Sequence, residues 1–303
     1  MDNQGPVLPL KIVLANDGSY FSSAAVDLMT HMSWPHNTTV SLVSVVPSYR
    51  KPTLSHDNRF EGFDKEEQTD CAAAQSRAVK IAKRLREYGL TVQTDIQSGL
   101  PASIILHYVE NLTPDLVVLS AKDLDTQLAK VGTTAVRVAH RANASVLIAR
   151  HGGVVRPLKV LLAVDGSQSS HRAVEFLCRL SLPQWANITI VSVAESNSMP
   201  LDVQLAGAYT PSQTRTLRPP TPHLVNEAYA INVRQSLHHC GVQPRISLTE
   251  GDTVDEILAL ANYQHTDLIV VGAHSRPHPD PLHLGTVARR LIEDARCSVM
   301  VVR

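Results

Sequence analysis

Residues 11–19 read Lys-Ile-Val-Leu-Ala-Asn-Asp-Gly-Ser, and residues 159–167 repeat them as Lys-Val-Leu-Leu-Ala-Val-Asp-Gly-Ser. Each stretch is a short apolar run, rich in β-branched residues, that ends in a polar turn. A near-continuous apolar run is typical of a strand that is buried on both faces, as in a parallel sheet. The repeat therefore predicts that the chain contains the same strand-and-turn unit twice.

The similarity between the two halves extends along the whole chain. Segments that recur in the same order are 33–35 and 181–183, 40–45 and 188–193, 115–121 and 267–273, 132–134 and 285–287, and 145–150 and 298–303. The glycines and proline of the segment 151–157 are typical of a linker. We therefore expect two domains, residues 1–150 and 157–303, each large enough to bury a core of its own.

Strands and helices alternate within each half. The strands predicted in the first half are 10–16, 39–46, 91–96, 116–120 and 145–149, and helical stripes such as Ala24, Leu28 and Met32 lie between them. This alternation predicts an α/β fold in which two doubly wound domains each carry a parallel sheet with helices on both faces. The long stretches 47–70 and 195–223 show no apolar periodicity, so we interpret them as mobile loops.

The bulk composition narrows the range of functions. The 28 Lys and Arg residues balance the 28 Asp and Glu residues, so no global field favours nucleic acid or an anionic membrane. The longest apolar runs are strand-sized, and the N-terminus does not resemble a signal peptide. The four cysteines, Cys71, Cys178, Cys240 and Cys297, form no Cys-x-x-Cys pair. We therefore expect free buried thiols and a cytoplasmic protein.

In an open parallel sheet, ligands bind beyond the carboxyl ends of the strands where the winding direction reverses. Asp17 and Asp165 follow the first strand of each half, and their carboxylates suit a ribose or an amine. Gly285 and Thr286 open a helix, whose N-terminal N–H groups suit a phosphate. The plainer alternative stays open, in which the aspartates cap the next helix and Gly-Thr is an ordinary helix start.

These patterns together resemble a known family. The strand ending in Asp-Gly-Ser, the Gly-x2-Gly-x9-Gly-(Ser/Thr) pattern and the closing strand 298–303 are similar to those of universal stress proteins, here in tandem form. The resemblance covers nearly the whole chain. It implies a five-stranded parallel sheet of order 3-2-1-4-5 in each half and dimerisation through the last strands. It also implies ATP binding in members that keep the full glycine pattern.

The resemblance assigns most of a nucleotide site to the second half. Its positions there are Asp165, Val193, Gly272, Ser275, Gly285, Thr286 and Val287. Asp165 would meet the ribose or adenine, and Val193 would lie beside the adenine. The remaining residues would form the phosphate loop, in which Ser275 replaces the middle glycine and could donate its hydroxyl. The expected ligand is ATP or a related adenine nucleotide, with or without Mg²⁺.

The first half departs further from the family pattern. Ser120 and Asp123 replace the first two glycines, while Asp17, Gly132 and Thr133 remain. A carboxylate about 5 Å from a phosphate costs roughly 3 kcal/mol at an effective dielectric near 20. We therefore expect no triphosphate in the first half, where the remaining residues are turn and capping residues.

A histidine-rich loop is the other conspicuous segment. His274, His278, Asp280 and His283 lie within ten residues. They offer metal-ligating groups, but the intervening prolines and the irregular spacing favour solvated side chains or phosphate contacts over a zinc site. The sequence contains no nucleophile elbow and no Walker motif. We therefore predict a nucleotide-binding protein of stress response or signalling, with two alternatives: a nucleotide-independent interaction protein, and a weak ATPase or a protein that phosphorylates itself at Thr286.

The last strand of each half is apolar after an initial serine. We expect strands 145–149 and 298–302 to contact each other within one chain as a pseudo-dimer, because this pairing would hide two hydrophobic edges. The alternatives are that each strand simply completes its own sheet, or that the chain also forms a homodimer.

Overall fold

The computed structural model describes residues 8–16, 22–47, 65–121, 131–150, 157–180, 186–194, 222–275 and 282–303. The first half contains β1 (Lys11–Asn16), α1 (Ser22–His31), β2 (Thr39–Pro47), α2 (Lys65–Glu87), β3 (Thr91–Gly99), α3 (Pro101–Leu112), β4 (Leu116–Ser120), α4 (Thr133–Arg141) and β5 (Ser145–Ala149). The second half contains β6 (Lys159–Ala163), α5 (Gln168–Arg179), β7 (Asn187–Ala194), α7 (Pro222–His239), β8 (Arg245–Glu250), α8 (Thr253–Gln264), β9 (Leu268–Gly272), α9 (Thr286–Asp294) and β10 (Ser298–Val302).

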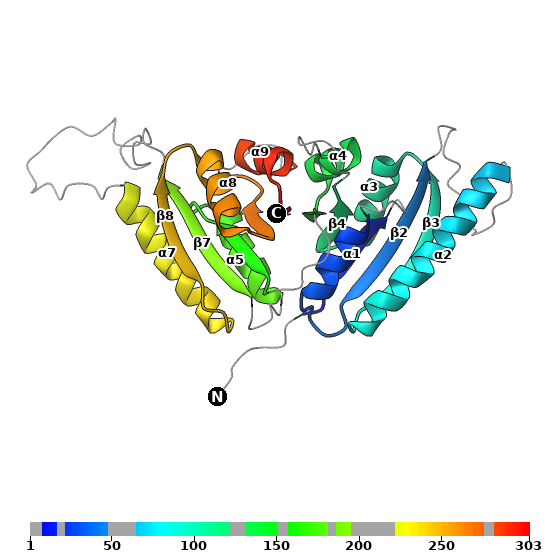
Figure 1. Cartoon of the computed structure of the whole chain (residues 1–303), viewed down its shortest axis with the longest axis horizontal. Coiled ribbons are helices and arrows are strands. Elements are labelled where there is room, and N and C mark those ends of the chain that lie inside the picture. Colours follow the sequence, from blue (N-terminus) through cyan, green and yellow to red (C-terminus); the bar gives the residue numbers. More distant parts are fainter. Residues whose placement is uncertain are drawn as a thin grey trace, which may run out of the picture.

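All ten strands belong to one sheet. Their order is β3-β2-β1-β4-β5-β10-β9-β6-β7-β8, so each half has the order 3-2-1-4-5 that the family resemblance implies. Neighbouring strands are parallel within each half. Figure 1 shows the first half on the right and the second half on the left. The predicted doubly wound α/β fold is confirmed.

The helices cover the two faces of the sheet in two sets. Helices α1, α2, α5 and α7 pack on one face, and α3, α4, α8 and α9 pack on the other. Strand β1 contributes side chains to both cores in alternation. Ile12 and Leu14 pack in the core on the first face, and Val13 and Ala15 pack in the core on the second. Each core contains residues of both halves, so burial continues across the boundary between them.

The halves meet where β5 and β10 pair in antiparallel fashion, with Met300 opposite Leu147. Both strands are buried along their whole length. Just beyond β5, the backbone N–H of Arg150 donates to the Ser298 hydroxyl (3.0 Å), and this hydroxyl donates to the Arg150 carbonyl (2.9 Å). The contact thus combines a backbone ladder, an apolar core and polar bonds at its end.

Two arginines extend this contact to the helices of the opposite half. The guanidinium of Arg150, only 3% exposed, donates to the Ile292 carbonyl in the last turn of α9 (2.8 Å). Arg303 donates in the same way to the Ala139 carbonyl in the last turn of α4 (2.7 Å). Because the last carbonyls of a helix lack intrahelical partners and carry partial negative charge, each half caps a helix of the other.

Two sequence-based expectations are wrong. Segments 47–70 and 195–223 are not loops throughout, because α2 begins at Lys65 and α7 at Pro222. The first turns of α2 are polar, so no apolar periodicity marked them. Residues 48–64 and 195–221 lie outside the described part of the chain.

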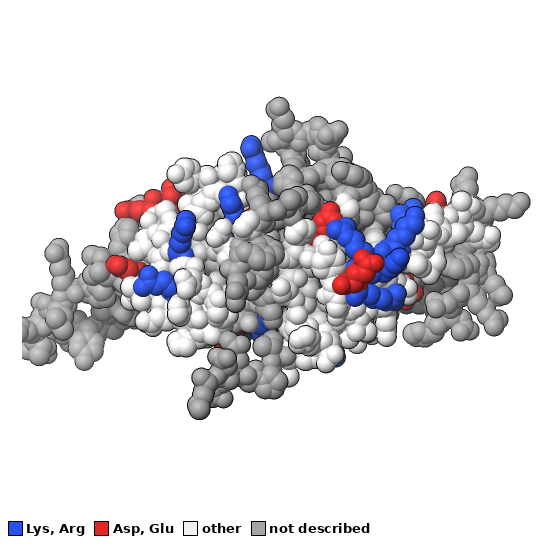
Figure 2. Space-filling model, turned by 60° about the horizontal axis from the view of Figure 1, so that its bottom comes forward, with Lys and Arg blue, Asp and Glu red and all other residues white. Residues whose placement is uncertain are grey.

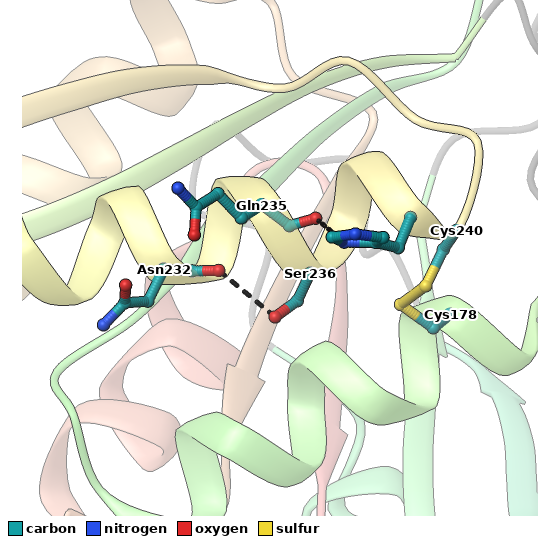
Figure 3. The surroundings of a disulfide bond; sticks show 6 residues. Cys178, Asn232, Gln235, Ser236 and Cys240 are labelled. Atoms are coloured by element: carbon teal, nitrogen blue, oxygen red, sulfur yellow. Dashed lines mark hydrogen bonds between the residues drawn. A yellow bond between two sulfur atoms is a disulfide. The ribbon is translucent and has the colours of Figure 1, made fainter.

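The expectation of four free thiols also fails. Cys178 and Cys240 form a disulfide, with Cα atoms 5.5 Å apart across a sequence separation of 62 residues (Figure 3). The packing of α5 and α7 on one face of the sheet brings them together, and this proximity has no signature in the cysteine spacing. Cys71 and Cys297 remain thiols and are buried, as the sequence predicts.

Replacing Arg150 by Met tests the exchange of helix caps between the halves. We expect a loss of about 1–3 kcal/mol in the free energy of unfolding, because a buried carbonyl of α9 loses a charged donor. Urea denaturation followed by circular dichroism measures this loss. The control is Arg172→Met on the exposed face of α5, which we expect to change stability by less than about 0.5 kcal/mol. Equal effects of the two variants would contradict the capping role.

Helix α4 carries a pH-sensitive contact with the second half. Burial, followed by the positive charge of Arg289, lowers the pKa of His140; Arg303 and His283 act in the same direction, and Glu293 opposes them. In the unfolded chain this imidazole titrates near pH 6.5. The unfolded state therefore binds more protons as the pH falls through 6.5, and the folded state is progressively destabilised below that pH.

We expect the His140→Gln variant to lose less stability than the parent protein between pH 7 and pH 5. Urea unfolding at a series of pH values measures the slopes. The exposed His265→Gln variant is the control and should keep the parent slope. Parallel pH profiles of the parent protein and His140→Gln would show that this histidine does not contribute.

Candidate functional site

The predicted ligand residues of the second half come from strands that are neighbours in the sheet. β6 lies between β7 and β9, so Asp165 beyond β6, Val193 near the end of β7 and Gly272 at the end of β9 share the carboxyl edge. The β6–β9 boundary is also where the winding direction of this half reverses. The structure thus places these three residues at the location where doubly wound sheets bind ligands.

The turn after β6 is held by its own side chains. A carboxylate oxygen of Asp165 accepts the backbone N–H of Ser167 (2.9 Å), and the Ser167 hydroxyl accepts the N–H of Ser170 (3.1 Å). The helix cap of α5 is therefore Ser167 and not Asp165. Asp165 stabilises the turn with one oxygen and remains exposed at the strand edge. Its counterpart Asp17 lies outside the described residues.

The two glycines of the phosphate pattern each permit a close approach of backbone. A Cβ added to Gly272 would lie 2.6 Å from the Ser169 carbonyl carbon. A glycine is therefore required at the end of β9, where the backbone at the start of α5 passes close by. The N–H of Gly285 donates to the Ala273 carbonyl (2.8 Å), which closes the loop between β9 and α9. A Cβ on Gly285 would lie 3.0 Å from that carbonyl oxygen. Close packing of the protein itself thus explains both glycines.

Helix α9 begins at Thr286 directly after this closure. Gly285 occupies the N-cap position and supplies no side-chain hydrogen bond. Thr286 and Ser275 are exposed, whereas Val287 packs partly into the core. The first N–H groups of α9 are therefore uncapped by a side chain next to the end of β9, which is an arrangement that suits an anion.

Arg290, one turn into α9, is held by carboxylates of the neighbouring helix. Its guanidinium pairs with Asp252 (3.2 Å) and Asp255 (3.1 Å) at the start of α8. Together with the Asp255 N–H, this arginine lowers the pKa of Asp252. Arg290 is thus a contact between α8 and α9, and its guanidinium is already engaged by these two carboxylates.

Helix α7 supplies side chains to the site that the sequence analysis missed. The Asn226 amide donates to the Val193 carbonyl (3.3 Å), at the position predicted to lie beside adenine. The Tyr229 hydroxyl lies 3.2 Å from the Ser170 hydroxyl, which in turn accepts the N–H of Asp165 (3.4 Å). No motif marks Asn226 or Tyr229, because they reach the site only through the packing of α7 on β7.

The first half contains a hollow at the corresponding edge. Its volume is about 210 Å³, and its lining residues are Asn16, Ser44, Val45, Val46, Pro47, Asp70, Ala74 and Arg77. Ala74 of the first half is the counterpart of Asn226 in the second half. Each lies fifteen positions before the glycine that follows its helix, Gly89 after α2 and Gly241 after α7. A small side chain in the first half thus leaves space where the second half places an amide.

The remaining predicted residues of the first half are only partly visible. Gly132 is the N-cap of α4 and Thr133 its first residue, matching Gly285 and Thr286. The hydroxyl oxygen of Ser120 is buried and forms no hydrogen bond within the described part of the chain. Asp123 lies outside the described residues.

The histidine-rich loop is likewise incomplete. His274 and His283 are described, whereas His278 and Asp280 lie outside the described residues. In the part of the chain that the structure does describe, no three His, Cys, Asp or Glu residues come together as metal ligands. Within the same residues, no helix combines the length and apolar character needed to cross a membrane.

Comparisons with known proteins agree with the repeated fold. The sequence profile of the universal stress protein family matches residues 10–150 and 158–303. The chain belongs to the universal stress protein family. A universal stress protein of Mycobacterium tuberculosis is 24% identical over 314 residues, covering 97% of this chain and 95% of that protein. The chain is therefore a tandem member.

Two further relatives illustrate the domain and the fold. Universal stress protein YxiE of Bacillus subtilis is 26% identical over 147 residues, which cover 48% of this chain and 98% of that protein. The crystal structure of a universal stress protein from Archaeoglobus fulgidus superimposes with a TM-score of 0.66 at 16% identity and covers 97% of this chain and 98% of that one. This structural likeness concerns the fold.

A pair of substitutions tests the packing role of Gly272. We expect Gly272→Ala to lower the free energy of unfolding by about 1–3 kcal/mol, because the new Cβ overlaps the start of α5. At the equivalent position of the first half, Ser120→Ala removes a buried hydroxyl that has no hydrogen-bond partner among the described residues, and it should leave stability unchanged or raise it by about 1 kcal/mol. Urea denaturation measures both. A neutral Gly272→Ala variant would contradict this close packing.

Proposed function

We propose that this tandem universal stress protein is a cytosolic binding protein that holds an adenine nucleotide in its second half and acts in stress response or signalling. The observation that carries the proposal is the convergence of the Asp165 turn and the uncapped start of α9 at the β6–β9 boundary. The family resemblance supports an adenine nucleotide as the ligand class.

The residues present fit the phosphate end of such a ligand. The Thr286 and Val287 N–H groups and the Thr286 hydroxyl would hold phosphate oxygens, and the Asp165 carboxylate would accept hydrogen bonds from ribose. At the adenine end, Asn226 already donates to the Val193 carbonyl, whose oxygen has a second lone pair that would accept a hydrogen bond from the base. A bound Mg²⁺ would neutralise part of the phosphate charge.

A second candidate function follows from the same contact. If the Asn226 side chain instead blocks the approach of a base to the Val193 carbonyl, the protein acts without a nucleotide through partner binding. Figure 2 shows Lys and Arg side chains mixed with Asp and Glu side chains over the first half, and Arg84 pairs there with Asp27 (2.5 Å). A face of mixed charge favours a protein partner over nucleic acid.

Calorimetry with ATP and Mg²⁺ on the full chain separates these functions. We expect one ATP per chain and a loss of affinity of about tenfold or more in Gly285→Val, because the added side chain fills the loop closure beside α9. Asp165→Asn should weaken binding less, because an amide still accepts a hydrogen bond from ribose.

The matched control is Ala74→Asn, which gives the first half the side chain that the second half has at this position. It should leave ATP affinity and stoichiometry unchanged. Loss of binding in Ala74→Asn, with normal binding by Gly285→Val, would place the ligand in the hollow of the first half. Absence of any ATP binding by the parent protein would leave the partner-binding function.

A further inference from the structure

The disulfide joins the ends of two helices whose other ends lie at the candidate site. Cys178 is in the last turn of α5, and Cys240 follows directly after α7 (Figure 3). At about 1.5 Å per helical residue, Tyr229 lies about 16 Å from Cys240 along α7. Ser170 lies about 12 Å from Cys178 along α5 by the same measure. The two helices are therefore linked twice, covalently where they end and by the contact between the Tyr229 and Ser170 hydroxyls near the start of α5.

The first half links the equivalent helices differently. There Arg84 of α2 pairs with Asp27 of α1. Glu175 is the counterpart of Asp27, because each lies ten residues after the aspartate of its Asp-Gly-Ser turn. Glu175 pairs instead with His171 of its own helix (3.3 Å). The second half thus has no acidic group turned toward α7 at this place.

The other partner of that ion pair is also replaced. Ser236 is the counterpart of Arg84, because each lies five residues before the glycine that follows its helix. The Ser236 hydroxyl donates to the Asn232 carbonyl within α7 (3.1 Å), as Figure 3 shows. Among the described residues, the disulfide therefore takes the place of an interhelical ion pair. Thiol reagents do not affect an ion pair, whereas a dithiol can open a disulfide.

The disulfide is within reach of such reagents. Cys178 and Cys240 are both partly exposed, whereas the thiols of Cys71 and Cys297 are buried. Burial raises the pKa of the Cys297 thiol to about 11, which keeps this thiol unreactive at neutral pH. Redox chemistry of the folded chain is thus directed to the pair that links α5 and α7. Disulfides are rare in a reducing cytosol unless they are transient or sensing.

We propose that Cys178–Cys240 is a reversible thiol switch that clamps α7 against α5 and thereby holds the Asn226 and Tyr229 contacts at the candidate site. A protein dithiol is the reductant: one of its thiolates attacks a cysteine sulfur and releases the other cysteine as a thiol after protonation. The second thiol of the reductant then displaces the first cysteine and closes the reductant's own disulfide. The chain gains two electrons and two protons.

Reduction also acts next to a contact between the halves. Arg179, the residue after Cys178, pairs with Asp115 of the first half (3.0 Å). The other carboxylate oxygen of Asp115 accepts the N–H of Lys11 at the start of β1 (2.9 Å). The switch thus lies between the candidate site of the second half and the contact of Arg179 with Asp115 beside the start of β1 in the first half.

The first test is whether the bond opens in the folded protein. Native chain is treated with dithiothreitol near pH 7, and accessible thiols are then titrated with an aromatic disulfide after the reductant is removed. We expect none before treatment and two afterwards, because Cys71 and Cys297 are buried. A disulfide that survives millimolar dithiothreitol in the folded chain would overturn the switch.

The second test is amide hydrogen exchange of the oxidised chain, the reduced chain and the Cys178→Ser/Cys240→Ser variant. We expect about tenfold faster exchange at 166–172 and 226–233 in both the double-serine variant and the reduced chain, because local opening no longer has to break a covalent link. Helix α2, whose clamp is an ion pair, is the internal control and should not change. Faster exchange confined to the residues next to 178 and 240 would overturn the proposal.

This inference goes beyond the proposed function and needs no nucleotide. If ATP binds, the reduced chain should bind it about three- to tenfold more weakly, because the α7 wall of the site is less ordered. If ATP binds neither form but the exchange difference is present, the nucleotide proposal fails and the switch stands. Equal hydrogen exchange in the oxidised and reduced chains, together with normal ATP binding, would overturn the switch and leave the nucleotide proposal standing.

Discussion

The backbone hydrogen bonds between β5 and β10 join two sheets that would otherwise each end in an apolar edge. Both strands are buried throughout, and unpaired strands of this kind promote aggregation. Once paired, they extend both cores across the two halves and bring Arg150 and Arg303 onto the last turns of the opposite helices. The position of α4 and α9, and with them the start of the candidate phosphate loop, depends on this pairing.

The sequence predicts the sheet because its strands are apolar runs that match in two copies. Burial on both faces leaves a strong signal, and the strand order follows once the family resemblance is recognised. The same holds for Gly272 and Gly285, whose places at the strand and helix ends could be read from their spacing. What spacing could not reveal is that Ser169 and Ala273 of the protein itself approach these glycines.

Contacts between elements far apart in the chain left no such signal. The Cys178–Cys240 bond, the Asn226 amide on the Val193 carbonyl and the hollow beside Ala74 all depend on how a helix lies on the sheet. Helix packing is set by many small side chains together, so no short motif encodes it. The first turn of α2 was not predicted for a related reason, because its sequence, Lys-Glu-Glu-Gln, contains no apolar residue.

The ion pair between Arg179 and Asp115 has a consequence for how the two halves can diverge. In the first half, His31 stands where the second half has Arg179, and its ring lies 2.7 Å from the Asp27 carbonyl of its own helix. A dimer of identical chains repeats every contact about its axis, so each contact must suit both copies. Covalent fusion of the two halves removes that symmetry requirement. A substitution that would be harmful if it occurred in both copies can then be retained in one half alone.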